Sequence, residues 1–170
     1  MAWVKAGWLL LGCVLVGCAG RSPYRKLPEV ERPLIEAVDL FLEPEQVEAY
    51  LEAPDARSRQ ALLDQWGVAE KYLALSDEQR AAVDEGVALP GMSKDAVAMA
   101  LGTPLRIRRQ YESAIEEYVE TYIYRYERTR KGEVFPSPPN SRSAYKNDVF
   151  ERRVEFVRGE VRAVVEVDVH

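Results

Sequence analysis

Alternation of side chains in two stretches, residues 118–127 and 154–168, most constrains how this chain can fold. Successive side chains of a β-strand point to opposite faces of the sheet, so a period of two indicates strands. In the first stretch tyrosines occupy one face and mostly β-branched residues the other: Tyr118, Tyr122, Tyr124 and Tyr126 against Val119, Thr121 and Ile123. Because aromatic and β-branched residues favour strands, we expect a long strand here.

The second stretch predicts a β-hairpin. Val154 and Phe156 share a face before a turn at Arg158-Gly159. The strand that follows carries small apolar residues at every second position, namely Val161, Ala163, Val165 and Val167. We expect this apolar face to receive the helices. Apolar residues and arginines also alternate near Leu105 to Ile107, which predicts an edge strand.

Residues 90–104 predict one short helix with both ends marked. Ser93 can accept a backbone N–H as the N-cap, and Asp95 places negative charge in the first turn. Gly102 suits the positive φ that often closes a helix, and Pro104 prevents its continuation. Small residues keep this helix slim: Ala96, Ala98 and Ala100. A bulky neighbour can therefore approach it closely.

Short helices are also expected before this segment. Apolar residues recur at helical spacing through residues 34–75. The boundaries between these helices are marked by Pro44, Pro54, Asp55 and Gly67. Ser76 and Gln79 form a capping-box pattern that opens a further helix. The expected fold class is therefore α+β: short helices packed on one face of a small antiparallel sheet, preceded by a small helical subdomain at 34–75.

The N-terminal residues resemble the signal of a bacterial lipoprotein. Lys5 precedes an uncharged apolar run at 6–16. A helix of this length reaches only about 16 Å, too short to cross a hydrocarbon core of about 30 Å. The run ends in Leu15-Val16-Gly17-Cys18, which is similar to a lipobox. The resemblance implies cleavage after Gly17 and acyl chains on Cys18.

Two alternatives to this anchor remain. Cys13 is a rival acylation site after a shorter apolar run, and the segment can also be an ordinary secretory signal. Ala19 is similar to the residue that follows the cysteine of lipoproteins exported to the outer membrane. We therefore expect a signal peptide at 1–17, and a lipid anchor with a flexible, proline-containing tether at 18–33. The expected location is the periplasmic side of the outer membrane.

The run G-M-S-x-x-x-V-x-x-A-L-G-T-P at residues 91–104 resembles the signature of the SmpA/OmlA (BamE) family. These are small lipoproteins of the outer-membrane β-barrel assembly machinery, in which helices cover antiparallel strands. The resemblance implies a helix–helix–meander domain at 76–170, with a β-barrel assembly complex as a candidate protein partner. A proline- and glycine-containing segment at 129–148 is expected to be a disordered loop. That loop and the helices at 34–75 depart from the family pattern.

The inventory of reactive side chains excludes several kinds of site. His170 is the only histidine, and Cys13 and Cys18 are the only cysteines. A cysteine nucleophile in the folded part, a Ser-His-Asp triad and a zinc site built on Cys or His are therefore excluded. We expect no catalytic residue, no metal and no cofactor. The formal net charge of −5, or −6 after loss of Lys5, argues against nucleic acid as a partner.

Three groups of residues are candidates for the surface. Aromatic contact area predicts a partner surface comprising Met92, Tyr118, Tyr122, Tyr124 and Tyr126. The alternative is a stripe at the edge of the core. Contacts with anionic lipids are predicted for Arg106, Arg108 and Arg109. The alternative for these is a solubilising sheet edge. A carboxylate cluster, interpreted as a solvated helix face rather than a Ca²⁺ site, comprises Glu43, Glu45, Glu48 and Glu52.

These features leave three functional hypotheses. The first is a non-catalytic, outer-membrane-anchored lipoprotein that acts as an accessory or scaffold in outer-membrane protein assembly. The second is an inhibitor-like or other protein-binding module on the same fold, directed at a periplasmic partner. The third is an enzyme with paired carboxylates drawn from Glu116, Glu117 and Glu120 beside Tyr122. The third is disfavoured because adjacent strand residues point to opposite faces.

Overall fold

A computed structural model describes residues 23–138 and 146–169 of the chain. The helical elements are η1 (Pro23–Lys26), α1 (Arg32–Val38), η2 (Asp39–Phe41), α2 (Pro44–Glu52), α3 (Ala56–Trp66), α4 (Ala69–Leu73), α5 (Asp77–Asp84) and α6 (Lys94–Leu101). The strands are β1 (Arg106–Glu112), β2 (Glu117–Arg128), β3 (Val134–Pro136), β4 (Asp148–Val157) and β5 (Glu160–Asp168). The fold is α+β, with the helices preceding an antiparallel sheet, as the sequence predicts.

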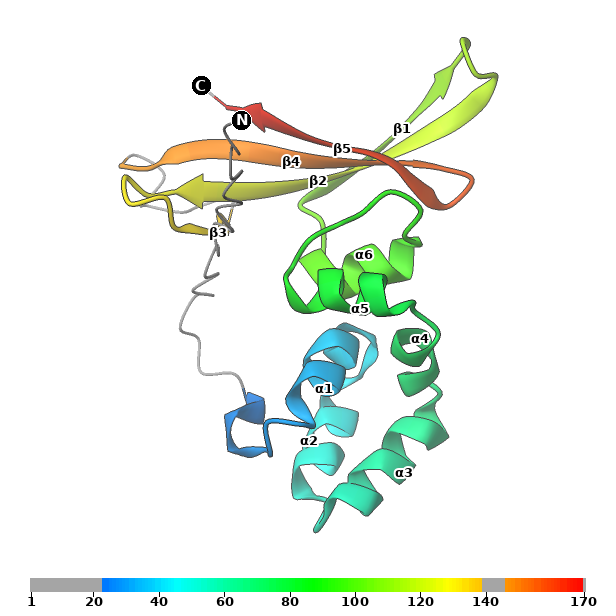
Figure 1. The fold of residues 1–170 in the computed structure, drawn as a ribbon, viewed down its shortest axis with the longest axis vertical. Coiled ribbons are helices and arrows are strands. Elements are labelled where there is room, and N and C mark those ends of the chain that lie inside the picture. The colour runs from blue at the N-terminus through cyan, green and yellow to red at the C-terminus, as the bar shows by residue number, and fades with distance from the viewer. Residues whose placement is uncertain (1–22, 139–145, 170) are drawn as a thin grey trace, which may run out of the picture.

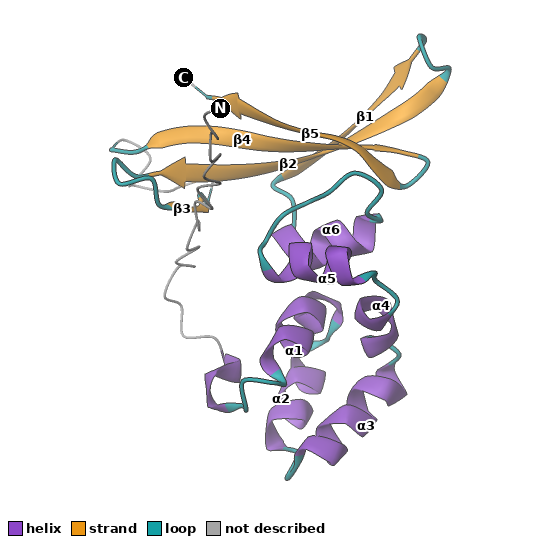
Figure 2. Ribbon diagram, viewed as in Figure 1, coloured by secondary structure: helices purple, strands orange, loops and turns teal. Residues whose placement is uncertain are grey.

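The described chain is arranged in layers, which Figure 1 and Figure 2 show. Helices α5 and α6 lie beneath the sheet, and α1 to α4 lie on the side of α5 and α6 that faces away from it. The buried residues form one cluster that runs from the first helices to the sheet. It includes Ile35 of α1, Val97 of α6 and Phe156 of β4. The helices at 34–75 therefore share their core with the rest of the fold.

Capping residues end the helices where the sequence predicts. Ser93 Oγ accepts the Ala96 N–H at 3.2 Å, and Gly102 follows α6 with φ of 75°. Ser76 and Gln79 form the predicted capping box at the start of α5. Each cap satisfies a backbone group that an α-helix cannot pair internally, so these ends need little help from tertiary contacts.

The sheet has the order β1-β2-β4-β5, with β3 also paired to β2, and these strand pairs are all antiparallel. Across β2 and β4, Tyr122 faces Val154 and Tyr126 faces Phe150. These residues belong to the face that the helices cover. Val119 and Ile123 are also buried but lie outside the main cluster, on the opposite face. The period-two pattern of the sequence is thus confirmed for β2.

The prediction that Val161, Ala163, Val165 and Val167 share the core face of the last strand is wrong after Val161. The pairing of β4 with β5 shifts between Glu155 and Phe156, so one extra residue enters β5. A bulge of this kind moves the following side chains to the other face. As a result Val161 and Val164 pack on the core, whereas Val165 is 45% exposed.

The flexible tether predicted at 18–33 is wrong for residues 23–33. Residues Pro23–Lys26 form a 3-10 helix, and α1 already begins at Arg32. Tyr24 and Leu27 are buried, and the Tyr24 hydroxyl donates to Asp39 at 2.7 Å. Two apolar side chains were enough to hold this proline-containing segment against the helices. The remaining tether residues, 18–22, lie outside the described part.

The disordered loop predicted at 129–148 is wrong at both ends. Residues Val134–Pro136 form β3 against β2, and β4 begins at Asp148. The anchor is the fully buried Glu127 carboxylate, which accepts from Ser137 Oγ at 2.8 Å and from Asn147 Nδ2 at 2.9 Å. Pairing of this kind offsets the cost of burying a carboxylate. Residues 139–145 lie outside the described part.

The chain just before α6 is fastened to the sheet. The Gly91 N–H donates to the Val161 carbonyl and the Val161 N–H donates to the Met92 carbonyl, both at 2.9 Å. Met92 has no exposed surface, and its Sδ accepts the Leu89 N–H at 3.0 Å. The Lys94 ammonium lies 2.7 Å from Glu120 on β2. These contacts set where α6 lies on the sheet.

We expect Met92→Ala to lower the free energy of unfolding by about 3 kcal/mol, because it leaves a cavity in a close-packed core. Urea unfolding of the purified chain measures this change. Met92→Leu, which nearly conserves volume, should cost under about 1.5 kcal/mol. Leu73→Ala is the control, because Leu73 is 57% exposed. Equal losses for Met92→Ala and Leu73→Ala would contradict the buried position.

Candidate functional site

Exposed apolar side chains concentrate on the hairpin formed by β1 and β2. In the described part of the chain, five of the twelve exposed large hydrophobic residues lie between positions 105 and 118: Leu105, Ile107, Tyr111, Ile115 and Tyr118. Single exposed apolar residues are ordinary, whereas contiguous apolar patches mark interaction sites. We refer to these five residues as the hairpin patch.

The hairpin is exposed because of its place in the sheet. Strand β1 pairs with β2 on one side, and no described strand pairs with its other side. Figure 1 shows the hairpin extending past the helices, which lie beneath the middle of the sheet. Six of the seven β1 residues are exposed, and Glu112 is half-buried. The hairpin patch therefore has neither a helix nor a strand over it within the described residues.

Part of the hairpin patch is ordered by side-chain contacts across the two strands. Tyr111 lies opposite Tyr118, and their ring centroids are 5.4 Å apart in an edge-on arrangement. The Arg109 guanidinium carbon lies 4.5 Å from the centroid of the Tyr118 ring. Cross-strand aromatic pairs and cation–π contacts each contribute about 0.5–1 kcal/mol. The hairpin thus presents partly preformed aromatic and cationic groups to solvent.

The three arginines predicted to contact lipid lie on one strand but on two faces. Arg106 and Arg108 lie on one face of β1 and Arg109 on the other, because strand residues alternate. Arg106 is within 3.7 Å of Glu151. Among the described residues, Arg108 and Arg109 have no carboxylate partner. The structure therefore gathers these charges along an edge, not on a single face.

The predicted partner surface is wrong for three of its five residues. Met92, Tyr124 and Tyr126 are 0%, 4% and 8% exposed, so they belong to the core. Burial raises the pKa of the Tyr124 hydroxyl above its ordinary value. Tyr122 is half-buried against Phe156, with ring centroids 4.7 Å apart, and Tyr118 alone is exposed. This face of β2 is packed in the core from Tyr122 onward but open at Tyr118, a difference along the strand that sequence periodicity does not reveal.

Sequence reasoning missed four of the five residues of the hairpin patch as site residues. The sequence pattern predicts Leu105 and Ile107 in an edge strand and indicates no role for Tyr111 or Ile115. A usable signal exists in the run R-I-R-R-Q-Y-E at 106–112, where apolar residues stand among charges too dense for a buried strand. Only the strand pairing shows that Tyr111 and Tyr118 are neighbours on one face of the hairpin.

The carboxylates proposed for an enzyme do not converge. Glu116 occupies a turn with φ of 53°, Glu117 accepts from Arg158 Nε at 2.9 Å, and Glu120 pairs with Lys94 at 2.7 Å. Two of the three are therefore engaged in ion pairs with separate cations. A glycosidase-like mechanism needs two carboxyl groups facing one bond, and this arrangement does not provide it.

The described residues contain neither a metal-ligating cluster nor a membrane-spanning helix. No group of three or more acidic, histidine or cysteine side chains there can hold a metal ion. The acidic residues of α2 and its N-cap are exposed: Glu43, Glu45, Glu48 and Glu52. Across residues 23–138 and 146–169, none of the helices has the length and apolar character needed to cross a bilayer. Gly17, Cys18 and the rival Cys13 lie outside the described part.

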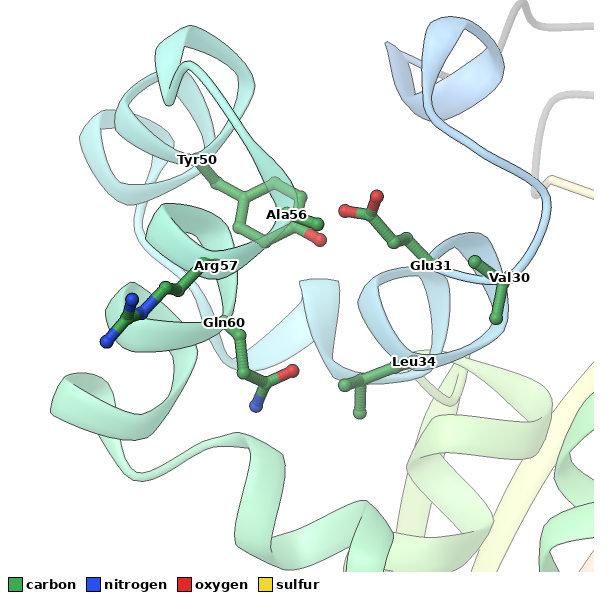
Figure 3. A pocket seen from close by; sticks show the side chains of 7 residues that line it. All are labelled: Val30, Glu31, Leu34, Tyr50, Ala56, Arg57 and Gln60. Carbon is green, nitrogen blue, oxygen red and sulfur yellow. The ribbon is translucent and has the colours of Figure 1, made fainter.

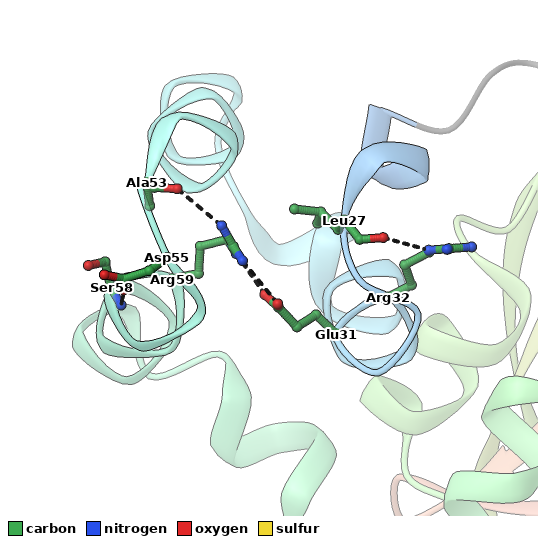
Figure 4. A network of polar contacts seen from close by, with 7 residues as sticks. All are labelled: Leu27, Glu31, Arg32, Ala53, Asp55, Ser58 and Arg59. Atoms are coloured by element: carbon green, nitrogen blue, oxygen red, sulfur yellow. Dashed lines mark hydrogen bonds and ion pairs between the residues drawn. The ribbon is translucent and has the colours of Figure 1, made fainter.

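A cavity of about 400 Å³ lies among the first helices, far from the hairpin in the fold. Its lining residues, shown in Figure 3, are Val30, Glu31, Leu34, Tyr50, Ala56, Arg57 and Gln60. Beside it, the Arg59 guanidinium donates to both Glu31 oxygens at 2.6 and 2.9 Å and to the Ala53 carbonyl at 3.1 Å (Figure 4). The only carboxylate of the cavity is thus committed to holding α1 against α3.

Comparisons with family profiles, with curated proteins and with solved structures find no match for this chain. The resemblance of residues 91–104 to the SmpA/OmlA (BamE) signature therefore remains a prediction. The hairpin patch is the candidate site that the geometry supports.

We expect Glu31→Gln to reduce the free energy of unfolding at pH 7 by about 1 kcal/mol, since a charged hydrogen bond is weakened. The hydrogen bond from Arg59 lowers the pKa of Glu31 below its ordinary value of 4.5. The folded protein thus binds this proton less readily than the unfolded chain does. The stabilisation is present above pH 4.5 and is lost as pH falls through the folded-state pKa.

Urea unfolding of both proteins between pH 7 and pH 3 measures this pH dependence. Glu52→Gln is the matched control, because Glu52 is exposed on α2. A stability difference between wild type and Glu31→Gln that stays constant down to pH 3 would contradict the assigned ion pair.

Proposed function

We propose that the protein is a non-catalytic lipoprotein, anchored in the outer membrane on its periplasmic side, that binds a protein partner through the hairpin patch. In this proposal it acts as an accessory or scaffold in outer-membrane protein assembly. The anchor rests on the lipobox-like ending at Cys18, and the assembly role rests on the resemblance at residues 91–104. The mode of action rests on the exposed hairpin.

The observation that carries the binding role is the exposure of Tyr118 and Ile107, at 55% and 53%, on the same projecting hairpin. Tyrosine provides a large contact area with little loss of side-chain entropy, and it is enriched where proteins bind each other. Arginine at the same surface adds directed hydrogen bonds. A surface built from these groups suits protein binding better than catalysis.

The packing of residues 23–33 against the helices supports a short link between the proposed anchor and the folded part. Only four residues separate Cys18 from Pro23, where the described structure begins. A fully extended chain covers at most about 3.6 Å per residue, so this link spans no more than about 18 Å. An anchored protein of this kind works beside the bilayer, with partners at or near the membrane.

The hairpin also favours a second candidate, an inhibitor-like module for a periplasmic enzyme. Ile115 is exposed at the turn of the projecting hairpin, where an apolar tip can enter an enzyme cleft. The two candidates differ in their partners. Recovery of a soluble hydrolase rather than a membrane complex would favour the inhibitor.

Site-specific photocrosslinking tests the proposed function. A photoreactive amino acid at position 118 should capture an envelope protein in living cells, whereas the same group at position 30 should not. Val30 is a suitable control because it is 86% exposed but lies at the helical end of the fold. Capture of the same proteins from both positions, or of none from position 118, would contradict a hairpin-mediated role.

Removal of the proposed anchor gives a separate prediction. Cys18→Ala should abolish acylation and release the protein from membranes, because two or more acyl chains are needed for stable attachment. Fractionation of cells and mass spectrometry of the N-terminal peptide measure both effects. Cys13→Ala serves as the control and should leave the lipid in place. If membrane attachment survives Cys18→Ala but is lost in Cys13→Ala, Cys13 is the acylated residue and the assignment to Cys18 is contradicted.

A further inference from the structure

The outer side of β1 combines an open strand edge with uncompensated positive charge. No described strand pairs there, so backbone N–H and C=O groups along Arg106–Glu112 are available to a further strand. Arg108 is exposed and has no carboxylate partner among the described residues. The Arg109 guanidinium lies over the Tyr118 ring and likewise has no carboxylate partner among the described residues.

This edge differs from β4 and β5 in its charge pairing. Every arginine of β4 and β5 has a carboxylate partner: Arg152 with Glu166, Arg153 with Glu151, and Arg162 with Glu112 and Glu155. The distances are 2.9, 2.7, 2.7 and 2.8 Å, respectively. In a chain with a net charge of −5, an edge with two unpaired cations is complementary to an acidic partner.

The chain itself has no suitable occupant in the segments outside the described part. Residues 1–22 and 139–145 contain no aspartate or glutamate, so neither can neutralise the edge. A second copy neutralises the edge incompletely. Antiparallel pairing of two β1 strands with Ile107 opposite Tyr111 places the two Arg109 residues directly opposite each other, and like charges in that position are destabilising. Pairing with Arg108 opposite Glu112 avoids this contact but places Arg109 opposite Tyr111, where it has no carboxylate.

We infer that the free edge of β1 binds an extended acidic segment of a partner protein, which adds to the sheet as a further strand. This inference rests on the protein-binding role proposed above and names the chemistry of the partner. Backbone hydrogen bonds to β1 supply affinity, and alternate side chains supply specificity. The incoming strand carries apolar residues opposite Ile107 and Tyr111, and carboxylates opposite Arg108 and Arg109.

A peptide of about seven residues, with valines opposite Ile107 and Tyr111 and aspartates opposite Arg108 and Arg109, is long enough to span β1 and tests this inference. The full-length chain in detergent micelles should bind the labelled peptide in fluorescence anisotropy, and added salt should weaken binding. Hydrogen exchange should show the amides of β1 protected by the peptide. The same peptide with N-methyl groups on the residues that face β1 keeps its charges but lacks the backbone N–H groups that would donate to β1. It should not bind.

Charge reversal of the edge gives the matched comparison. Arg108→Glu combined with Arg109→Glu should weaken peptide binding by at least about tenfold. Arg130→Glu combined with Lys131→Glu changes the net charge equally at the exposed β2–β3 turn and should leave binding unchanged. Circular dichroism checks that the edge variant is folded. If it is not, hydrogen exchange of β1 and binding of the N-methylated peptide, both measured on the wild-type chain, test the inference instead.

Four results would overturn the inference: no peptide binding, equal binding of the N-methylated peptide, binding without protection of β1, or equal weakening by the two double variants. A concentration-dependent dimer that protects β1 would assign the edge to a second copy instead. Capture of a partner at position 118 without peptide binding would leave the proposed function standing and remove this inference. Peptide binding by a protein that is not located in the envelope would support this inference and contradict the proposed function.

Discussion

The packing of α6 against the aromatic face of β2 and β4 is the contact on which the rest of this structure depends. The segment before α6 is hydrogen-bonded to the start of β5, and Met92 is enclosed at that junction. Helix α6 is positioned by this junction, and α5 packs beside it beneath the sheet. Helices α1 and α4 pack in turn on α5 and α6. Burial of Val97 and Phe156 in one cluster links the two halves of the chain.

The same packing decides which part of the sheet remains available. Helix α6 contacts β2 at Glu120 and Tyr122 through Lys94, whereas Tyr118 at the start of the strand stays exposed. The β1–β2 hairpin therefore extends beyond the helical layer and keeps its apolar side chains in solvent. At the opposite end the sheet is closed by β3, whose neighbours donate to the buried Glu127 carboxylate. One end of the sheet is sealed by hydrogen bonds, and the other presents an open edge.

Several parts of the fold follow from local patterns alone. Ser76, Ser93 and Gly67 mark helix ends in the sequence because a cap is satisfied within one helical turn. The tyrosines of β2 share a face because the strand period holds for any strand. The bulge in β5 and the burial of Tyr24 escaped prediction, since both depend on residues distant in sequence. The candidate site escaped for the same reason: exposure is a property of the assembled layers.

By itself, the sequence determined the α+β class, the positions of the helix caps, the alternation of β2 and the absence of histidine and cysteine from residues 23–169. These depend on residue type and on neighbours within a few positions. Only the tertiary structure decided that Met92, Tyr124 and Tyr126 are enclosed while Ile107, Tyr111 and Tyr118 are exposed. The physical reason is that a strand pattern specifies two faces, whereas the position of the helices determines where along the strand a face is covered.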